Sequence, residues 1–468
     1  MGSSLVRDVS LISQFTLSQL ETHFRCCLPE SLFLKSKQKA NSRDRLYTQP
    51  LTFWCFLWQA FNPKASCRSV VKQIQALFVL LGLQKVSSDD GVYCKARQRL
   101  PASMLVQGLS ASAQAAERRA PKTSFLSGRP VRAVDGTMIT LADTTANQKK
   151  YPRVQNGHNN LGFPQMRLVV LFCLNSGAIL SRMTGNQHTS ESRLFHQLLG
   201  SMNSGDIVIA DQGFGNFVII SILRALGIDF IARSGRHVDC RHGTRLGAKD
   251  RLVSWKKGNK PSPLMTRKQW KNAPKEQTVR VICGRIKQKG FRVTEMRLVT
   301  TLLDPIKYPA NEILKAYLRR WRLEMCLDDL KTTMKIEQLR CKTPDMVEKE
   351  LLVHLIGHNL IRWLMAETAR NHEVDMERIS FQGTMDAFRE FSQEMSQARS
   401  AKKRRQLWTD LLRSLAQDLV PDRPGRREPR AVKRQHHKYP ALNKARGKFR
   451  DHPKRNERRK RKWIRARA

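Results

Sequence analysis

The sequence predicts an α/β protein with a helical N-terminal region, and two features support this. Short apolar runs such as "LVVLF" and "DIVIAD" have the composition of buried strands. Segments with helical periodicity alternate with these runs and fill the first 125 residues. Antiparallel strands followed by strand-helix-strand units predict a mixed sheet with helices on its faces.

The N-terminal region, residues 1–125, is expected to be a helical domain and the candidate DNA-binding domain. Its amphipathic segments are "ISQFTLSQLETHF", "PLTFWCFLWQAF" and "SVVKQIQALFVLLGL". No Gly/Ser linker follows it, so a change in composition marks its end.

Residues 126–235 are expected to form the first part of the α/β core. "VRAVDG" and "MITLA" predict a hairpin, and "MRLVVLFCLN", "GAILSRMTG" and "GDIVIADQG" predict further strands. "ESRLFHQLLGSM" and "NFVIISILRALG" predict helices, and "DFIARS" predicts a short strand after them.

Three more regions follow along the chain. Residues 236–292 are basic and rich in turn residues, and they predict a β-rich insertion. Residues 293–375 resume the core with "EMRLVTTLLD" and a long apolar helix around "ELLVHLIGHNLIRWLMAET". Residues 376–468 are expected to form a C-terminal helical region and a basic tail.

The charge of the chain points to a polyanionic partner. The 85 Lys and Arg residues against 39 Asp and Glu residues give a net charge of +46. A surplus of this size supplies the phosphate contacts that dominate nucleic-acid affinity. The last 48 residues carry 20 Lys and Arg against 4 Asp and Glu, a surplus of 20 − 4 = +16, which predicts either a DNA-contacting arm or a solubilising tail.

Membrane and extracellular locations are not favoured by the sequence. It has no apolar run of about 18 residues, and its first residues lack the pattern of a signal peptide. The ten cysteines are scattered without a repeated CxxC, which predicts reduced thiols and a cytoplasmic protein. The cluster "HVDCRH" has no second cluster at zinc-finger spacing, so it predicts a basic loop.

Three carboxylates are the candidate catalytic residues. Asp135 ends the apolar run "VRAVD", Asp211 ends "DIVIAD", and Glu324 lies on a later helix. An acid at the end of a buried strand points into the crevice where α/β sheets build their sites. Taken alone, Asp135 could instead belong to an Asp-Gly hairpin turn, and Asp211 could be a helix N-cap.

Together these acids would suit two Mg²⁺ ions, for which Mn²⁺ can substitute, because such hard cations prefer carboxylate oxygens. Two ions about 4 Å apart can activate a water or a 3′-hydroxyl at a phosphodiester and stabilise the leaving oxygen. A strongly basic protein has such a substrate within reach.

The segment "YLRRWRLEMCLDDLK", residues 317–331, predicts one helix that carries a lone acid among basic residues. Arg320, Glu324 and Lys331 lie close to whole helical turns after Tyr317, so all four would share one face over about 21 Å. The alternative is an amphipathic helix with a solvated charged stripe. Asp328, one turn beyond Glu324, is a rival for the third acid.

The segment carries the YREK signature, in which Tyr is followed by two residues and Arg, then three residues and Glu, then six residues and Lys. By this signature the chain resembles the "insertion sequence four" family of DDE transposases. The signature falls on Tyr317, Arg320, Glu324 and Lys331, and "AVDGTMI", "IADQGFGNF" and "FIARS" also resemble that family. The resemblance covers about residues 115–370.

The resemblance implies an RNase H-like catalytic core in which Asp135, Asp211 and Glu324 hold two divalent metal ions. It implies cut-and-paste transposition of double-stranded DNA: binding of terminal inverted repeats, metal-dependent strand cleavage and strand transfer by a homodimer assembled on DNA, in the cytoplasm of a bacterium and associated with its nucleoid. The other three YREK residues would contact end phosphates. A tryptophan of the insertion would stabilise a flipped base, and Trp255 and Trp270 are both candidates.

Two alternatives to a transposase remain open on the sequence. One is a catalytically silent DNA-binding protein derived from such an enzyme. The other is a different RNase H-like metal nuclease, such as a repair resolvase, although the basic insertion and the YREK helix are not expected there.

Overall fold

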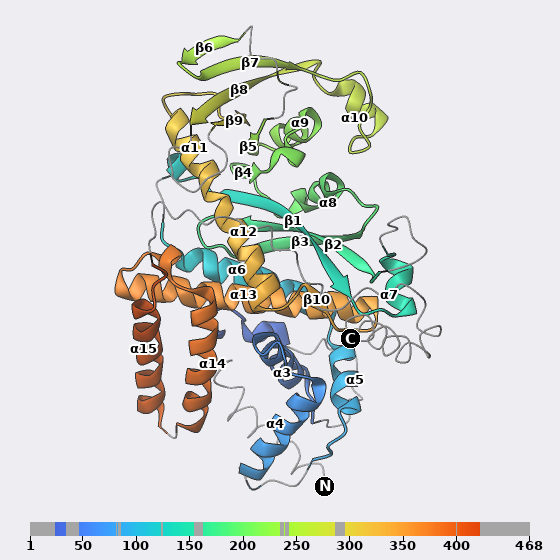
Figure 1. Ribbon diagram of the computed structural model, residues 1–468, viewed down its shortest axis with the longest axis vertical. Coiled ribbons are helices and arrows are strands. Elements are labelled where there is room, and N and C mark those ends of the chain that lie inside the picture. Colours follow the sequence, from blue (N-terminus) through green and yellow to red (C-terminus); the bar gives the residue numbers. More distant parts are fainter. Residues whose placement is uncertain are drawn as a thin grey trace, which may run out of the picture.

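The computed structural model is organised around one ten-stranded mixed sheet with helices on both faces (Figure 1). The predicted fold class is therefore confirmed: a mixed α/β core, preceded by helices. The structure describes residues 24–33, 46–80, 82, 86–122, 125–153, 162–234, 238, 243–285, 295–398 and 400–421.

The strand order explains which chain segments meet. Along the sheet, the strands are β3 (Ile179–Asn186), β2 (Gln165–Cys173), β1 (Val131–Leu141), β4 (Ile207–Ala210), β5 (Asp229–Arg233), β9 (Glu295–Thr300), β8 (Glu276–Arg285), β7 (Asp250–Lys256) and β6 (Thr244–Gly247). β1 pairs parallel with β4, β4 pairs parallel with β5, and the other neighbours along this path are antiparallel. The short β10 (Gln338–Leu339) also pairs with β1, in parallel.

The hairpin predicted at Asp135-Gly136 is wrong. β1 runs without a turn through both residues, because β2 pairs with it continuously from Arg132 to Thr140. An Asp-Gly pair forms a hairpin turn only where no partner strand continues past it, and here β2 fixes both residues in extended pairing.

Two apolar clusters hold the sheet between its helices. Alternate residues of β1 point to opposite faces, so Ala133 and Ile139 join one cluster and Val134 joins the other. On one face lie α8 (Glu191–Leu198) and α9 (Phe217–Ala225). On the other lie α6 (Ala102–Arg119) and the long α13 (Pro344–His372) (Figure 1).

A buried asparagine ties α13 to its neighbours. The side chain of Asn359 accepts a hydrogen bond from the backbone N–H of Ile179 at 2.7 Å and donates to the same residue's carbonyl at 2.9 Å. It also donates to Ser112 Oγ on α6 at 3.3 Å. Satisfying a buried amide in this way fixes α13 relative to β3 and α6.

The described part of the N-terminal region is helical, as predicted. α3 (Gln49–Phe61) and α4 (Cys67–Leu80) form at two of the predicted segments, and α5 (Gly91–Arg99) and α6 follow. The first predicted segment, "ISQFTLSQLETHF", lies almost entirely outside the described residues.

The predicted insertion contributes β6, β7, α10 (Arg267–Asn272) and β8, and its strands extend the main sheet through β9. Arg280 on β8 is fully buried and forms two hydrogen bonds with the carboxylate of Asp250 on β7, one of them 2.8 Å long. It also donates to the carbonyl of Tyr308 at 2.7 Å, which joins the insertion to the segment that returns to the core. The cluster "HVDCRH" lies outside the described residues apart from Val238.

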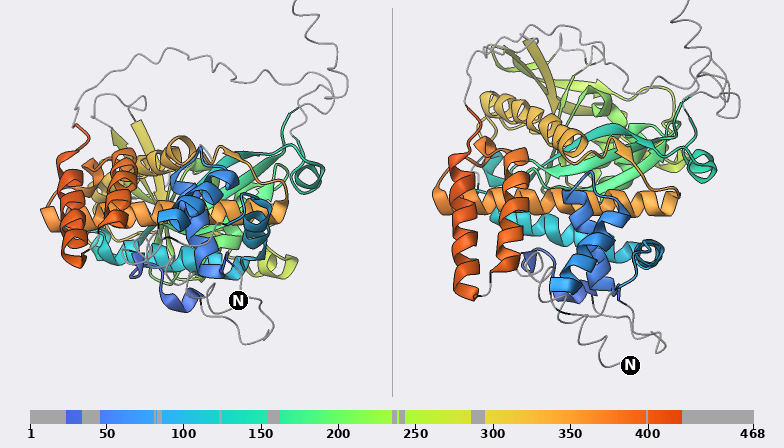
Figure 2. Two further views of the ribbon diagram at one scale, coloured as in Figure 1. Left: turned by 90° about the horizontal axis from the view of Figure 1, so that it is seen from below. Right: turned by 60° about the horizontal axis from the view of Figure 1, so that its bottom comes forward.

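The C-terminal region begins with α14 (Phe381–Gln397) and α15 (Ala401–Gln417), which stand side by side against α13 (Figure 2). The basic tail lies outside the described residues from 422 onward. None of the described helices is both long and apolar enough to cross a membrane. The remaining short elements are η2 (Glu30–Phe33), η3 (Phe125–Gly128), α7 (Thr145–Lys150), η4 (Leu199–Ser201), η5 (Gln212–Phe214) and η7 (Met376–Arg378).

The single helix predicted over residues 317–331 is also wrong in detail. The segment contains the end of α11 (Ala310–Arg319), all of α12 (Trp321–Asp328) and part of a π-helical turn, η6 (Asp329–Thr333).

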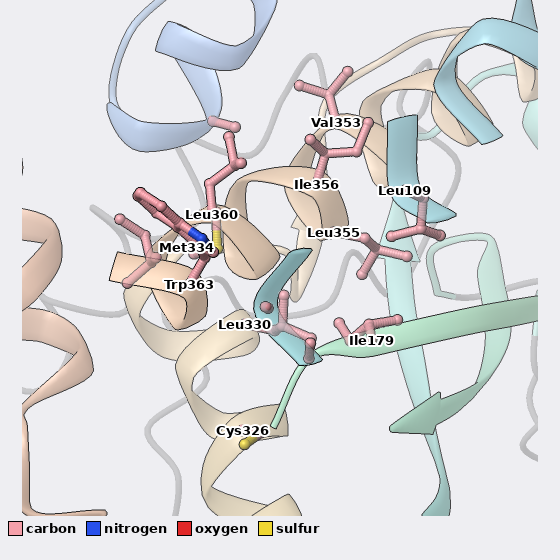
Figure 3. Packing of buried hydrophobic residues seen from close by; sticks show 14 of the residues in the cluster. Leu109, Ile179, Cys326, Leu330, Met334, Val353, Leu355, Ile356, Leu360 and Trp363 are labelled. Carbon is pink, nitrogen blue, oxygen red and sulfur yellow. The ribbon is translucent and has the colours of Figure 1, made fainter. Parts of the chain in front are cut away.

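The π-helical turn has a packing cause. Leu330 and Met334 are both fully buried, and they lie with Cys326 on the side of the segment that faces Leu355 and Leu360 of α13 (Figure 3). The extra residue in the turn keeps this apolar side against α13 as the chain leaves α12. As a result, residues after 328 are rotated away from the phase of a regular helix.

Candidate functional site

The first candidate acid lies where one edge of β1 changes partner. β4 pairs with β1 only as far as Ala133, and β10 pairs with it only from Thr140. Asp135 lies in the interval between them, half-buried, and its Oδ1 accepts a hydrogen bond from the N–H of Gly136 at 2.8 Å. The sheet is therefore open beside this carboxylate.

The second acid lies beside the first, directly after the neighbouring parallel strand β4. Ala133 pairs with Ile209, so continuing the register by two residues places Asp211 beside Asp135. Asp211 occupies the N-cap position of η5, but its side chain makes no capping hydrogen bond. Instead its Oδ1 accepts a hydrogen bond from the hydroxyl of Tyr317 at 3.5 Å. Asp211 therefore faces α11, and the alternative of a capping role does not describe its side chain.

Arg320 connects the third acid to the first. Its side chain, at the junction of α11 and α12, is only 7% exposed. One guanidinium nitrogen lies 3.3 Å from Oε1 of Glu324, and another lies 4.0 Å from Oδ2 of Asp135. The same guanidinium lies 5.6 Å from the centre of the Tyr317 ring. Through these contacts the three predicted acids, Tyr317 and Arg320 form one site.

The pKa shifts reflect this shared environment. Burial raises the pKa of Asp135, and the charges of Glu324 and Asp211 raise it further, while the Gly136 N–H and Arg320 oppose the rise. Burial would lower the pKa of Arg320, but its anionic neighbours outweigh this and raise it. Burial raises the pKa of Tyr317 to about 12, so its hydroxyl remains a hydrogen-bond donor at neutral pH. The acids thus repel one another and depend on a cation for compensation.

The three acids lie around the guanidinium of Arg320, and their carboxylates are not close enough to one another to bind one metal ion together. Among the residues that the structure describes, no three His, Cys, Asp or Glu side chains are grouped closely enough to hold one metal ion. Glu324 is half-exposed, with 55% of its side chain accessible, so its carboxylate has room to move.

Lys331 and the rival acid Asp328 stand apart from this group. Lys331 lies on η6, where the π-helical turn has changed the phase of the helix. No hydrogen bond or ion pair joins it to another residue in the described part of the chain. Asp328 is exposed, whereas Glu324 contacts Arg320 and its charge raises the pKa of Asp135. Glu324 is therefore the acid of this helix that faces the other two.

Arg233 is a basic residue at this site that the sequence analysis did not single out. It ends β5, and because Ala210 pairs with Ala232 it lies level with Asp211. Its charge lowers the pKa of Tyr317, the residue whose hydroxyl donates to Asp211. The signal was its place at the end of the strand that follows "DIVIAD" in the parallel part of the sheet.

The two candidate tryptophans of the insertion have different surroundings. The Trp255 ring packs edge-on against Phe217, with centroids 6.2 Å apart. Trp270 lines a hollow of about 420 Å³ together with Lys260 and Phe217, and the Nζ of Lys257 lies 5.0 Å from the centre of its ring. Trp270 thus borders this hollow, and Trp255 is not among the residues that line it.

The chain is similar to known transposases. It is 26% identical over 339 residues to the transposase InsG for insertion sequence element IS4 of Escherichia coli (strain K12), a match that covers 70% of this chain and 72% of that protein. A piggyBac transposase synaptic complex with hairpin DNA matches at 9% identity and a TM-score of 0.40, over 88% of this chain and 84% of that chain. A pre-cleavage Mos1 transpososome matches at 13% identity and a TM-score of 0.16, over 42% of this chain and 61% of that chain.

The family assignment comes from a match to a whole domain. The model of the transposase DDE domain matches residues 126–360, half of the chain, and this range contains Asp135, Asp211 and Glu324. The chain therefore belongs to the family of transposases with a DDE domain.

Proposed function

We propose that the chain is a cut-and-paste DNA transposase that binds the terminal inverted repeats of an insertion sequence and catalyses strand cleavage and strand transfer there. The observation that carries this proposal is the meeting of three carboxylates around the guanidinium of Arg320 in a domain of the DDE family. They come from β1, from the residue that follows β4, and from α12.

Asp135, Asp211 and Glu324 would hold two divalent ions, Mg²⁺ or Mn²⁺. Their fit rests on the donor set, since carboxylate oxygens are the ligands that hard cations prefer. It also rests on the raised pKa of Asp135, which burial causes first and the charges of Glu324 and Asp211 increase. When bound, the ions supply activation of a water or 3′-hydroxyl and stabilisation of the leaving oxygen.

The chain's own residues position the DNA. Arg320 and Lys331 would contact phosphates at the transposon end, and the hydroxyl of Tyr317 would donate to a third. In the DNA-free chain Arg320 neutralises the acids, and an incoming phosphate would compete with them for its guanidinium. Trp270 is the better candidate for stacking on a flipped base, because it borders an open hollow.

Double-stranded DNA is the proposed partner, both as inverted-repeat ends and as target, and a homodimer is the proposed assembly on it. The charge of +46 supports this, since a polyanion is needed to neutralise it. We assign residues 1–125 to end recognition, residues 126–235 and 293–375 to the catalytic core, and residues 376–468 to further DNA contacts.

The direct test uses DNA that flanks the gene. The purified chain is incubated with a fragment that contains the gene and its surroundings, with Mg²⁺, and the ends of the products are mapped by sequencing. Cleavage at a matched pair of inverted repeats outside the reading frame is expected. Tight binding to the repeats without any cleavage would instead favour the silent DNA-binding alternative.

A further inference from the structure

A fourth carboxylate lies against the strand that carries Asp135. Glu191 is the first residue of α8, whose N-cap is Ser190. A Cβ added at Gly136 would lie 3.0 Å from both the carboxyl carbon and Oε1 of Glu191. The Glu191 carboxylate therefore contacts β1 at the residue directly after Asp135, in space that any side chain at position 136 would fill.

The turn before α8 fixes this position. Arg167 on β2 donates a hydrogen bond to the carbonyl of Thr189 at 2.6 Å. Thr189 also packs closely on Gly185. A Cβ added at Gly185 would lie 2.8 Å from the Cβ of Thr189. The start of α8 is thus held to β2 and β3, and Glu191 is held over β1.

The same helix packs against the segment that carries Asp211. Phe195 of α8 meets Phe214 of η5 edge-on, with ring centroids 5.4 Å apart. Leu194 lies in the same apolar cluster as Val134, the residue before Asp135. α8 therefore contacts the segments that carry both aspartates, and its acid lies against Gly136, the residue after Asp135.

A simpler role for Glu191 is to stabilise the N-terminus of α8, where an acid is favoured by about 0.3–1 kcal/mol. That role applies to an acid in the first turn of any helix, and it does not require close approach to β1. Glu191 is exposed, and among the described residues no basic side chain forms an ion pair with it.

We propose that Glu191 is a fourth carboxylate of the metal site, and that it holds a divalent ion together with Asp135, directly or through a water on the ion. The inference rests on the proposed function, because it assigns one more residue to the same site. Three carboxylates leave two divalent ions with a formal charge of 4 − 3 = +1, and a fourth acid completes neutralisation.

The test measures binding of Mn²⁺ alone to the full chain without DNA, from the electron paramagnetic resonance signal of the free ion. Glu191→Gln keeps the size of the side chain and should weaken Mn²⁺ binding about tenfold. Gly136→Ala should weaken it similarly, because the added Cβ displaces the carboxylate. Asp345→Asn removes an exposed acid from the first turn of α13 and is the matched control, which should bind as the wild type does.

Asp135→Asn separates the inference from the proposed function. If Asp135→Asn loses Mn²⁺ binding while Glu191→Gln binds like the wild type, Glu191 is only a helix-terminal acid and the inference is overturned, whereas the proposed site stands. If Asp135→Asn also binds like the wild type, the proposed metal site itself is wrong. Melting curves of each variant confirm that it is folded.

Discussion

Arg320 carries the positive charge that offsets the negative charges of the acids in the site. It is buried, it contacts Asp135 and Glu324, and the acids around it raise its pKa. A buried cation between two acids occupies a position that a divalent ion would also favour. Its charge and the charge of a bound ion therefore compete for the same carboxylates.

Replacing Arg320 tests this competition. Arg320→Gln should raise the affinity of the DNA-free chain for Mn²⁺ severalfold. It should also weaken binding to transposon-end DNA. The slope of log affinity against log salt should fall by about 0.9, the amount that corresponds to one phosphate contact. Both quantities can be followed by titration. Arg319→Gln is the matched control, because Arg319 pairs with Glu377 at 3.0 Å and is not among the groups that shift the pKa of Asp135.

Unchanged Mn²⁺ affinity in Arg320→Gln would mean that the guanidinium does not compete with the ion. Unchanged DNA binding would remove it from the phosphate contacts.

The π-helical turn η6 carries a titratable acid of its own. Burial raises the pKa of Asp329 to about 7, with a further rise from Asp328 and an opposing effect of Arg362. Because the folded-state pKa lies above the unfolded one, the folded chain binds the extra proton. Stability is therefore lost as the pH rises from about 4 through 7.

Asp329→Asn should remove this loss. We expect the unfolding free energies of the variant and the wild type to agree near pH 4 and to differ by roughly 1–3 kcal/mol in favour of the variant at pH 8. Denaturant unfolding at both pH values measures the difference. Asp345→Asn, at an exposed position of α13, serves as the control. Parallel curves for Asp329→Asn and the wild type from pH 4 to 8 would show that the Asp329 side chain is solvated.

At the scale of elements, most of the secondary structure could be predicted from the sequence. The runs "DIVIAD" and "LVVLF" and the helical segments of α8, α9 and α13 carry their own apolar patterns. Two local predictions failed for non-local reasons. Asp135-Gly136 remains extended because β2 pairs across it, and the YREK segment changes to a π-helical turn because Leu330 and Met334 pack under α13.

The candidate site likewise has a part that the sequence predicts and a part that only the tertiary structure shows. Both aspartates could be identified at the ends of apolar runs, but only Asp211 follows the end of a strand, because β1 continues through Asp135. Their neighbouring positions in the sheet follow from the pairing of β1 with β4. The position of Arg233 needed the neighbouring register, and the contact between Glu191 and Gly136 needed the packing of α8. Arg233 had a sequence signal in its place at the end of the strand after "DIVIAD". The contact between Glu191 and Gly136 had none, because only the tertiary structure brings these residues together.

For the whole molecule, charge is the dominant property. The surplus of +46 is spread over the chain, but the last 48 residues alone contribute +16. If the tail contacts DNA, removal of residues 421–468 should lower the slope of log affinity against log salt by about 0.9 for each lost phosphate contact. Binding measured from low to moderate salt gives this slope. A Gly/Ser segment of equal length in place of the tail controls for chain length, and an unaltered slope would leave the tail with a solubilising role.

The central claim is that Asp135, Asp211 and Glu324 act together on DNA. The most direct measurement compares Mg²⁺-dependent cleavage of transposon-end DNA by Asp135→Asn, Asp211→Asn and Glu324→Gln with cleavage by Asp328→Asn, while end binding is followed in parallel. The three site variants should lose cleavage by on the order of a thousandfold or more and still bind the ends, whereas Asp328→Asn should cleave like the wild type. Wild-type cleavage by any of the three, or its loss in Asp328→Asn alone, would contradict the assignment.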